Sequence, residues 1–169
     1  MRSFSRSSLV VLVLITGIFA RPAFSQTNKP PIVFPPLPAE TKAFLMDADE
    51  FTLLSLNPSS DLEHKGKTGF RGHRVLGETQ IGAGVERTRL VNAFEQGIAN
   101  GGGLFLCFNP RHGIRAKKDG KTIECLICFE CANVYIYSES ATNGYSTAST
   151  PSAIFNASLA LHHVRGAAE

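Results

Sequence analysis

Residues 112–129 read HGIRAKKDGKTIECLICF, and this stretch decides the fold. Two runs of strand-forming residues, HGIRAKK and KTIECLICF, flank Asp119-Gly120. That dipeptide favours the tight type I′ turn that joins two antiparallel strands. With the turn as the reference point, Lys118 is opposite Lys121, and the rest of the pairing follows. The sequence therefore predicts a β-hairpin here.

Apolar residues alternate along the second strand of this hairpin. Every second side chain of a strand points to the same face. One face therefore carries the candidate core residues, which are Ile123, Cys125, Ile127 and Phe129. The runs LFLCF before the hairpin, residues 104–108, and ANVYIY after it, residues 132–137, are also typical of strands. These segments together predict a continuous antiparallel sheet.

The clearest helix is predicted over residues 85–99. Its apolar side chains fall on one face at helical spacing, at Leu90, Val91, Phe94 and Ile98. Asn100 and the glycines at 101–103 are expected to end it. A second helix is predicted to begin at Pro151, a residue favoured in the first helical turn, with Thr150 as its cap.

Two further strands are predicted nearer the N-terminus, at residues 51–57 and 70–81, and residues 138–150 are predicted to form a polar loop. The fold class that follows is α+β. We expect an antiparallel sheet of about five strands with two helices packed on one face.

The N-terminal residues 1–25 have the three parts of a signal peptide. A start with Arg2 and Arg6 is followed by a short apolar run and then by small residues that suit cleavage after Ser25. The apolar run is shorter than the roughly 20 residues that a membrane-spanning helix needs. Residues 26–41, rich in proline, are expected to form an extended arm, and residues 42–165 a single α+β domain.

Cleavage of the signal peptide changes the charge balance. Of the 17 basic residues, Arg2, Arg6 and Arg21 precede the cleavage point, and all 14 acidic residues follow it. The mature chain is therefore close to neutral. It has neither the basic surface expected of a nucleic-acid-binding protein nor a basic patch for a membrane. The prediction is a periplasmic or secreted protein without a membrane span after cleavage.

A disulfide between Cys107 and Cys131 is the first interpretation of the cysteines. Pro110 cannot donate a hydrogen bond to a sheet, so a one-residue bulge there would place these two cysteines opposite each other. Directly opposed residues on antiparallel strands are close enough for a disulfide, and export favours oxidation. Closing such a loop stabilises a fold by about 3 kcal/mol.

Two other interpretations use the same segment. Cys107, His112, Cys128 and Cys131 have the spacing of a zinc ribbon, with two pairs of ligands joined by a hairpin. Cys128 and Cys131 alone could form a redox dithiol, although a strand rather than an activating helix is expected to follow them. Cys125 is interpreted as a buried apolar residue.

Arg111, beside His112, is a candidate for anion binding or catalysis, against the simpler interpretation that it pairs with a local acid. The sequence contains no phosphate-binding loop, nucleophile elbow or HExxH motif. It therefore offers no catalytic signature, and a non-enzymatic role is favoured.

The elements CFNPRHGIRA and ICFEC, with the Asp-Gly hairpin between them, resemble a family of exported bacterial proteins of uncharacterised function. That family combines a Cys-x-x-Pro-Arg-His element, a hairpin, an Ile-Cys-Phe-x-Cys element and a terminal helix. The positions that match the family pattern are Cys107, Pro110, Arg111, His112, Cys128 and Cys131, and Cys125 falls outside it. The resemblance implies export from a bacterium and brings no known activity.

The sequence thus predicts a small exported domain with a structural or binding role at the cell envelope. The alternative is a zinc-binding or thiol-redox module built from Cys107, His112, Cys128 and Cys131.

Overall fold

A computed structural model describes residues 34–58, 69–103 and 105–167. The predicted signal peptide and residues 26–33 of the predicted arm lie outside these residues. The described elements, in chain order, are α1 (Ala39–Met46), β1 (Glu50–Leu56), β2 (Val75–Gln80), α2 (Val85–Ala99), β3 (His112–Lys118), β4 (Lys121–Cys128), β5 (Asn133–Tyr137), β6 (Thr142–Ser146) and α3 (Ser152–Leu161).

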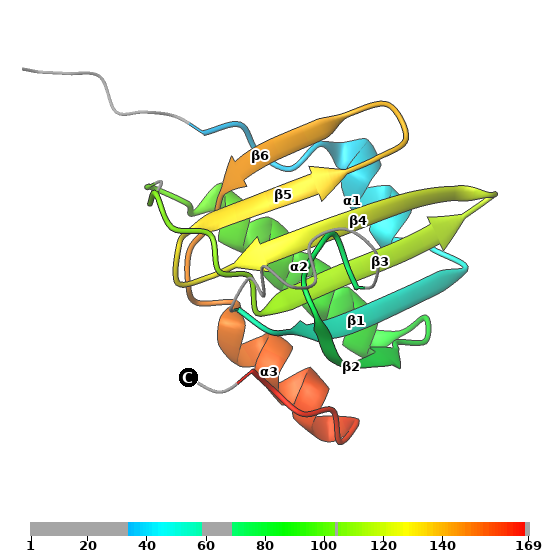
Figure 1. Cartoon of the computed structure of the whole chain (residues 1–169). Helices are drawn as coiled ribbons and strands as arrows, with labels where there is room; N and C mark the ends of the chain where they lie inside the picture. The colour runs from blue at the N-terminus through cyan, green and yellow to red at the C-terminus, as the bar shows by residue number, and fades with distance from the viewer. Residues whose placement is uncertain (1–33, 59–68, 104, 168–169) are drawn as a thin grey trace, which may run out of the picture. The chain divides into compact units, whose positions relative to one another are not determined.

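The strands form one antiparallel sheet of six strands in the order β2-β1-β3-β4-β5-β6 (Figure 1). The α+β class is confirmed. The sheet has one strand more, and the domain one helix more, than the sequence predicted. Among the described helices, none is long and apolar enough to cross a membrane.

The hairpin between β3 and β4 has the predicted register. Lys118 is opposite Lys121, and the pairing continues without a shift to His112 opposite Ile127. Asp119 and Gly120 both have positive φ, 50° and 75°, as a type I′ turn requires. Local turn chemistry therefore determined this central pair of strands.

The main core lies between the sheet and the helices. α1 and α2 lie behind the sheet in the view of Figure 1, and α3 packs against α2 and β1. The predicted core face of β4 is confirmed, because Cys125, Ile127 and Phe129 are buried in this core and Ile123 packs against it. A smaller apolar cluster lies on the other face of the sheet, where Leu54, Leu56, Phe70 and Leu126 meet.

α2 has the predicted bounds, but the helix before β1 was not predicted. α1 begins at Ala39, inside the segment expected to be an extended arm, and Leu37 just before it is buried in the core. Of the residues of α1, only Leu45 is buried. A helix with so narrow an apolar face has little periodicity for sequence analysis to detect.

Two predictions around the second half of the chain were wrong. Residues 105–108 do not form a strand, because β3 already has β1 on one edge and β4 on the other. The predicted loop 138–150 contains β6, a polar edge strand that pairs with β5. Its composition resembles that of a loop, so only its pairing with β5 distinguishes it.

The closing helix is confirmed, but its predicted cap is not. Pro151 lies at the capping position itself, and no side chain donates or accepts a capping hydrogen bond there. Thr150 therefore does not cap α3.

Candidate functional site

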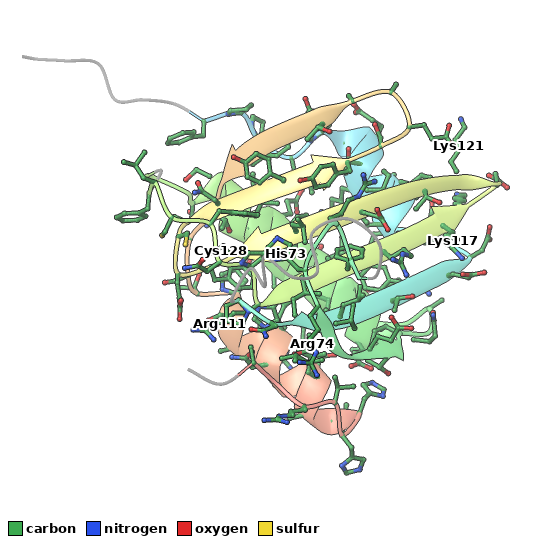
Figure 2. All side chains as sticks on the ribbon, in the orientation of Figure 1. His73, Arg74, Arg111, Lys117, Lys121 and Cys128 are labelled. Atoms are coloured by element: carbon green, nitrogen blue, oxygen red, sulfur yellow. The ribbon has the colours of Figure 1, made fainter. Side chains whose placement is uncertain are left out.

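The residues singled out by the sequence gather at one end of the sheet. β3 and β4 are antiparallel, so the start of β3 and the end of β4 lie together, opposite the Asp119-Gly120 turn. Figure 2 shows Cys128 and Arg111 at this end and Lys117 and Lys121 at the other. The coil before β3, the turn after β4 and the start of α3 complete the site.

The turn after β4 brings Cys131 back to Cys128. The backbone N–H of Cys131 donates to Cys128 Sγ at 3.2 Å. Ala132 then takes a positive φ of 51°, which turns the chain into β5. An alanine in this conformation is uncommon, so the surrounding contacts hold the turn in place.

Cys107 reaches the same turn from the preceding coil. Asn133, the first residue of β5, donates through Nδ2 to the carbonyl oxygens of Phe105 at 2.8 Å and of Cys107 at 3.2 Å. The thiol of Cys107 donates a hydrogen bond to the sulfur of Cys131, which raises the pKa of Cys107. The structure thus brings Cys107 and Cys131 together, although they are 24 positions apart.

The reason given in the sequence analysis for this contact was wrong. Cys107 is not on a strand opposite Cys131 across a bulge, because β3 begins only at His112. Its approach depends on the coil that Asn133 anchors. All four cysteines carry free thiols in the structure, and the Cys107–Cys131 disulfide stays a prediction.

Cys131 also contacts Cys128. Burial is the main cause that raises the pKa of Cys131, and the hydrogen bond that its thiol donates to Cys128 acts in the same direction. Hydrogen bonds donated to Cys131 by Cys107 and by the backbone of Asn109 partly oppose this rise. We call Cys107, Cys128 and Cys131 the thiol cluster. The raised pKa values of Cys107 and Cys131 disfavour thiolates at neutral pH, unlike the activated cysteine of a redox enzyme.

His112 does not join the thiol cluster. It pairs with Ile127 and shares the helix-covered face with it, so Cys128, one residue further on, points to the opposite face. No group of three or more His, Cys, Asp or Glu side chains in the described residues is arranged to hold a metal ion. The predicted zinc site of Cys107, His112, Cys128 and Cys131 is therefore not assembled.

His112 instead packs in the core. Its ring lies 5.4 Å from the ring of Phe129 and 5.6 Å from that of Phe155, and only 5% of the residue is exposed. Its Nε2 makes a 2.7 Å hydrogen bond with Oδ1 of Asn156 on α3, and its buried Nδ1 has no hydrogen-bond partner in the described part of the chain.

Arg111 pairs with a nearby acid. Its Nε lies 3.3 Å from Oε1 of Glu130, an exposed residue in the turn after β4. This is the simpler of the two interpretations of Arg111. The guanidinium and the carboxylate both lie at the rim of a pocket.

That pocket has a volume of about 180 Å³ and lies where the start of β3 meets the start of α3. Its wall combines polar side chains with apolar surface. Most of the lining residues are polar, namely Asn109, Arg111, His112, Glu130, Ser149, Ser152 and Asn156, and Cys128, Phe129 and Ala167 complete the wall. We call it the polar pocket. Arg111, His112 and Cys128 were identified from the sequence, whereas the lining residues of α3 were not. Asn156 is 44 positions from His112, and no spacing motif links the two.

The buried position of His112 predicts a loss of stability in acid. Burial lowers the pKa of His112 from 6.5, with a further lowering from Arg111, against an opposing effect of Asn156. Below about pH 6.5 the unfolded chain therefore binds a proton that the folded protein does not, and the free energy of unfolding falls as the pH drops from about 6.5 towards the lower folded pKa. Urea denaturation at a series of pH values measures this.

The control for this prediction is His112→Phe, which keeps a buried ring without the titration. The pKa of His73 is also lowered by burial, so the variant should lose only part of the pH dependence. An unchanged pH dependence in His112→Phe would show that His112 titrates alike in the folded and unfolded chains.

Comparisons of this chain with models of protein families, with curated proteins and with solved structures found no match. The resemblance to a family of exported bacterial proteins therefore stays a prediction.

Proposed function

We propose that this protein is an exported domain that binds a small polar molecule in the polar pocket and acts at the cell envelope without catalysis. The observation that carries this proposal is the polar pocket itself, which is built around a buried histidine. The pocket is small, so its ligand would have few non-hydrogen atoms.

The composition of the pocket wall supports binding over a purely structural role. A buried polar atom without a partner costs about 1–3 kcal/mol, so an apolar side chain at position 112 would serve a core better. The chain instead places His112 between Phe129 and Phe155, with Nδ1 unsatisfied among the described residues. Residues that contradict optimal packing are most often found at functional sites.

The thiols support a non-catalytic role. A nucleophilic cysteine needs a lowered pKa or an adjacent base, whereas the pKa values of Cys107 and Cys131 are raised. His112 points to the other face of the sheet from Cys128, where it cannot act as that base. The cysteines suit a covalent cross-link better than a reaction centre.

Export rests on the N-terminal residues 1–25, which have the three parts of a signal peptide. Sequencing of the protein recovered from the cell envelope should find Gln26 at its N-terminus. Detection of Met1 there would contradict cleavage.

A ligand screen by NMR tests the binding proposal. The isotope-labelled mature protein is titrated with a library of small polar molecules, each with about ten or fewer non-hydrogen atoms. We expect the strongest binders to shift the amide signals of His112, Ser152 and Asn156.

Two variants make this screen specific. Asn156→Ala removes a wall of the polar pocket and should weaken binding at least about tenfold, since a site built around a hydrogen-bonding group depends strongly on it. Asn143→Ala, at an exposed position on β6, is the matched control and should bind as the unaltered protein does. A screen in which no compound shifts the pocket signals would refute the proposal.

A further inference from the structure

The thiol of Cys131 lies between two other thiols. It accepts a hydrogen bond from Cys107 and donates one to Cys128. Because one sulfur can form only one disulfide, Cys131 can be joined to Cys107 or to Cys128 but not to both. The arrangement therefore offers two mutually exclusive cross-links.

Hydrogen bonds from a backbone N–H and from a side-chain amide hold both neighbours of Cys131 in place. The backbone N–H of Cys131 donates to Cys128 Sγ at 3.2 Å, which keeps the two ends of the Cys128–Cys131 turn together. The side chain of Asn133 donates to the carbonyl oxygen of Cys107 at 3.2 Å, which ties the coil to the strand that follows the turn. These hydrogen bonds hold the turn and the coil that carry the three cysteines.

The three members of the thiol cluster differ in their access to solvent. Cys107 is exposed, whereas Cys128 and Cys131 are each 1% exposed. An external reagent can therefore reach Cys107 first. Cys125 takes no part, because it lies on the other face of β4, fully buried in the main core, where burial strongly raises its pKa.

We propose that the thiol cluster is a thiol–disulfide exchange site. Cys107 reacts first with the disulfide of a partner molecule. Cys131 then forms a disulfide with Cys107, and Cys128 can replace Cys107 in that bond. Cys128 also lines the polar pocket, so the two sites adjoin, but the exchange of disulfides needs no ligand there and goes beyond the proposed function. It makes the bond between the coil and the turn reversible.

The partner's disulfide oxidises the site in two thiol–disulfide exchange steps. The Cys107 thiolate, which is a minor species at neutral pH because the pKa of Cys107 is raised, attacks one sulfur of the partner's disulfide. This slow step forms a mixed disulfide and releases one thiolate. The Cys131 thiolate then attacks Cys107 Sγ, which forms the Cys107–Cys131 bond and releases the second thiolate. Two thiols of this protein are oxidised, the partner's disulfide is reduced to two thiols, and these take up the two protons.

The internal step involves no net oxidation. The Cys128 thiolate attacks Cys131 Sγ, the Cys128–Cys131 bond forms, and the Cys107–Cys131 bond breaks. The sulfur of Cys107 leaves with the electron pair and takes up the proton that Cys128 has lost. The coil around Cys107 is then no longer covalently tied to the turn, and its exposed thiol is available again.

Oxidation with glutathione disulfide tests this site. The mature protein is oxidised, quenched with acid, alkylated and mapped by mass spectrometry of its peptides. We expect the unaltered protein to contain both the Cys107–Cys131 and the Cys128–Cys131 cross-links. Cys125→Ala, the matched control, should give the same two products.

The single variants separate the steps. Cys128→Ser should form only the Cys107–Cys131 cross-link, and Cys107→Ser only the Cys128–Cys131 cross-link. Cys131→Ser should retain glutathione on Cys107, with its release slowed at least about tenfold because the intramolecular attack is gone. Alanine variants at the same positions repeat the test if a serine variant does not fold. Absence of any Cys128–Cys131 cross-link, in the unaltered protein and in Cys107→Ser, would overturn the proposal.

Discussion

Replacement of Phe94 by alanine is expected to lower the free energy of unfolding by about 3–5 kcal/mol, the usual cost of truncating a fully buried phenylalanine. Phe94 lies near the middle of α2, and its side chain is fully buried in the main core between helix and sheet. The lost contacts leave a cavity that a rigid sheet on one side cannot close. Urea denaturation followed by circular dichroism measures the change.

Glu95 provides the matched control on the next residue of the helix. Its carboxylate forms a 2.6 Å ion pair with Lys42 of α1, and both side chains are about one-third exposed. Because exposed ion pairs contribute little, Glu95→Ala should cost no more than about 1 kcal/mol. Equal losses from the two substitutions would contradict the burial of one helix face.

The second large effect concerns the Cys107–Cys131 cross-link in oxidised protein. A disulfide that closes a loop of about 25 residues stabilises a fold by about 3 kcal/mol. Cys107→Ser and Cys131→Ser should therefore lower the midpoint of thermal unfolding by similar amounts, of roughly 10 °C. The double variant should be close in stability to either single variant, because all three lose the Cys107–Cys131 bond. The Cys128–Cys131 bond that Cys107→Ser can still form closes a much shorter loop and constrains the unfolded chain less.

Reduction and a chelator complete this test. In the presence of a reductant the three variants and the unaltered protein should unfold at nearly the same temperature. Cys128→Ser should keep the stability of the oxidised protein, since it retains both ends of the cross-link. If a chelator destabilised the reduced, unaltered protein as much as the cysteine substitutions do, a metal would hold the segment instead.

His112→Ala does not separate these interpretations by stability alone. In the zinc-ribbon interpretation His112 is a ligand beside the cysteines, and its loss would destabilise the fold by releasing the metal. The structure places its ring against Phe129 and Phe155, so truncation should destabilise the fold through lost packing. The chelator, and not this variant, is the decisive measurement.

Short-range patterns explain what could be predicted. The Asp119-Gly120 turn sets the β3–β4 register, because both residues must take positive φ. α2 was predicted from the spacing of its apolar residues within a single segment. β6 and α1 escaped prediction because neither carries a pattern of its own. The pairing of β6 with β5 and the packing of Leu45 in the core identify them.

In the candidate site too, some features follow from short-range sequence patterns and others only from tertiary contacts. The pairing of Cys107 with Cys131 was predicted from a bulge, but the contact arises from a coil that Asn133 holds. The polar pocket combines His112 with Asn156, whose neighbourhood depends on where α3 returns to the sheet. The contacts of Arg87 also depend on the tertiary structure. This buried residue donates to the carbonyl oxygens of Ala48 at 2.6 Å and Ile81 at 2.8 Å.

The sequence by itself determined the fold class, the central hairpin, the helix at 85–99 and the face of β4 that enters the core. These features depend on turn chemistry and on periodicity, which act between residues close together in the chain. Only the tertiary structure decided that His112 and Cys128 point to opposite faces, that three thiols meet at one turn, and that α3 supplies a wall of the polar pocket. Such contacts join residues distant in sequence, and their geometry is set by the packing of whole elements.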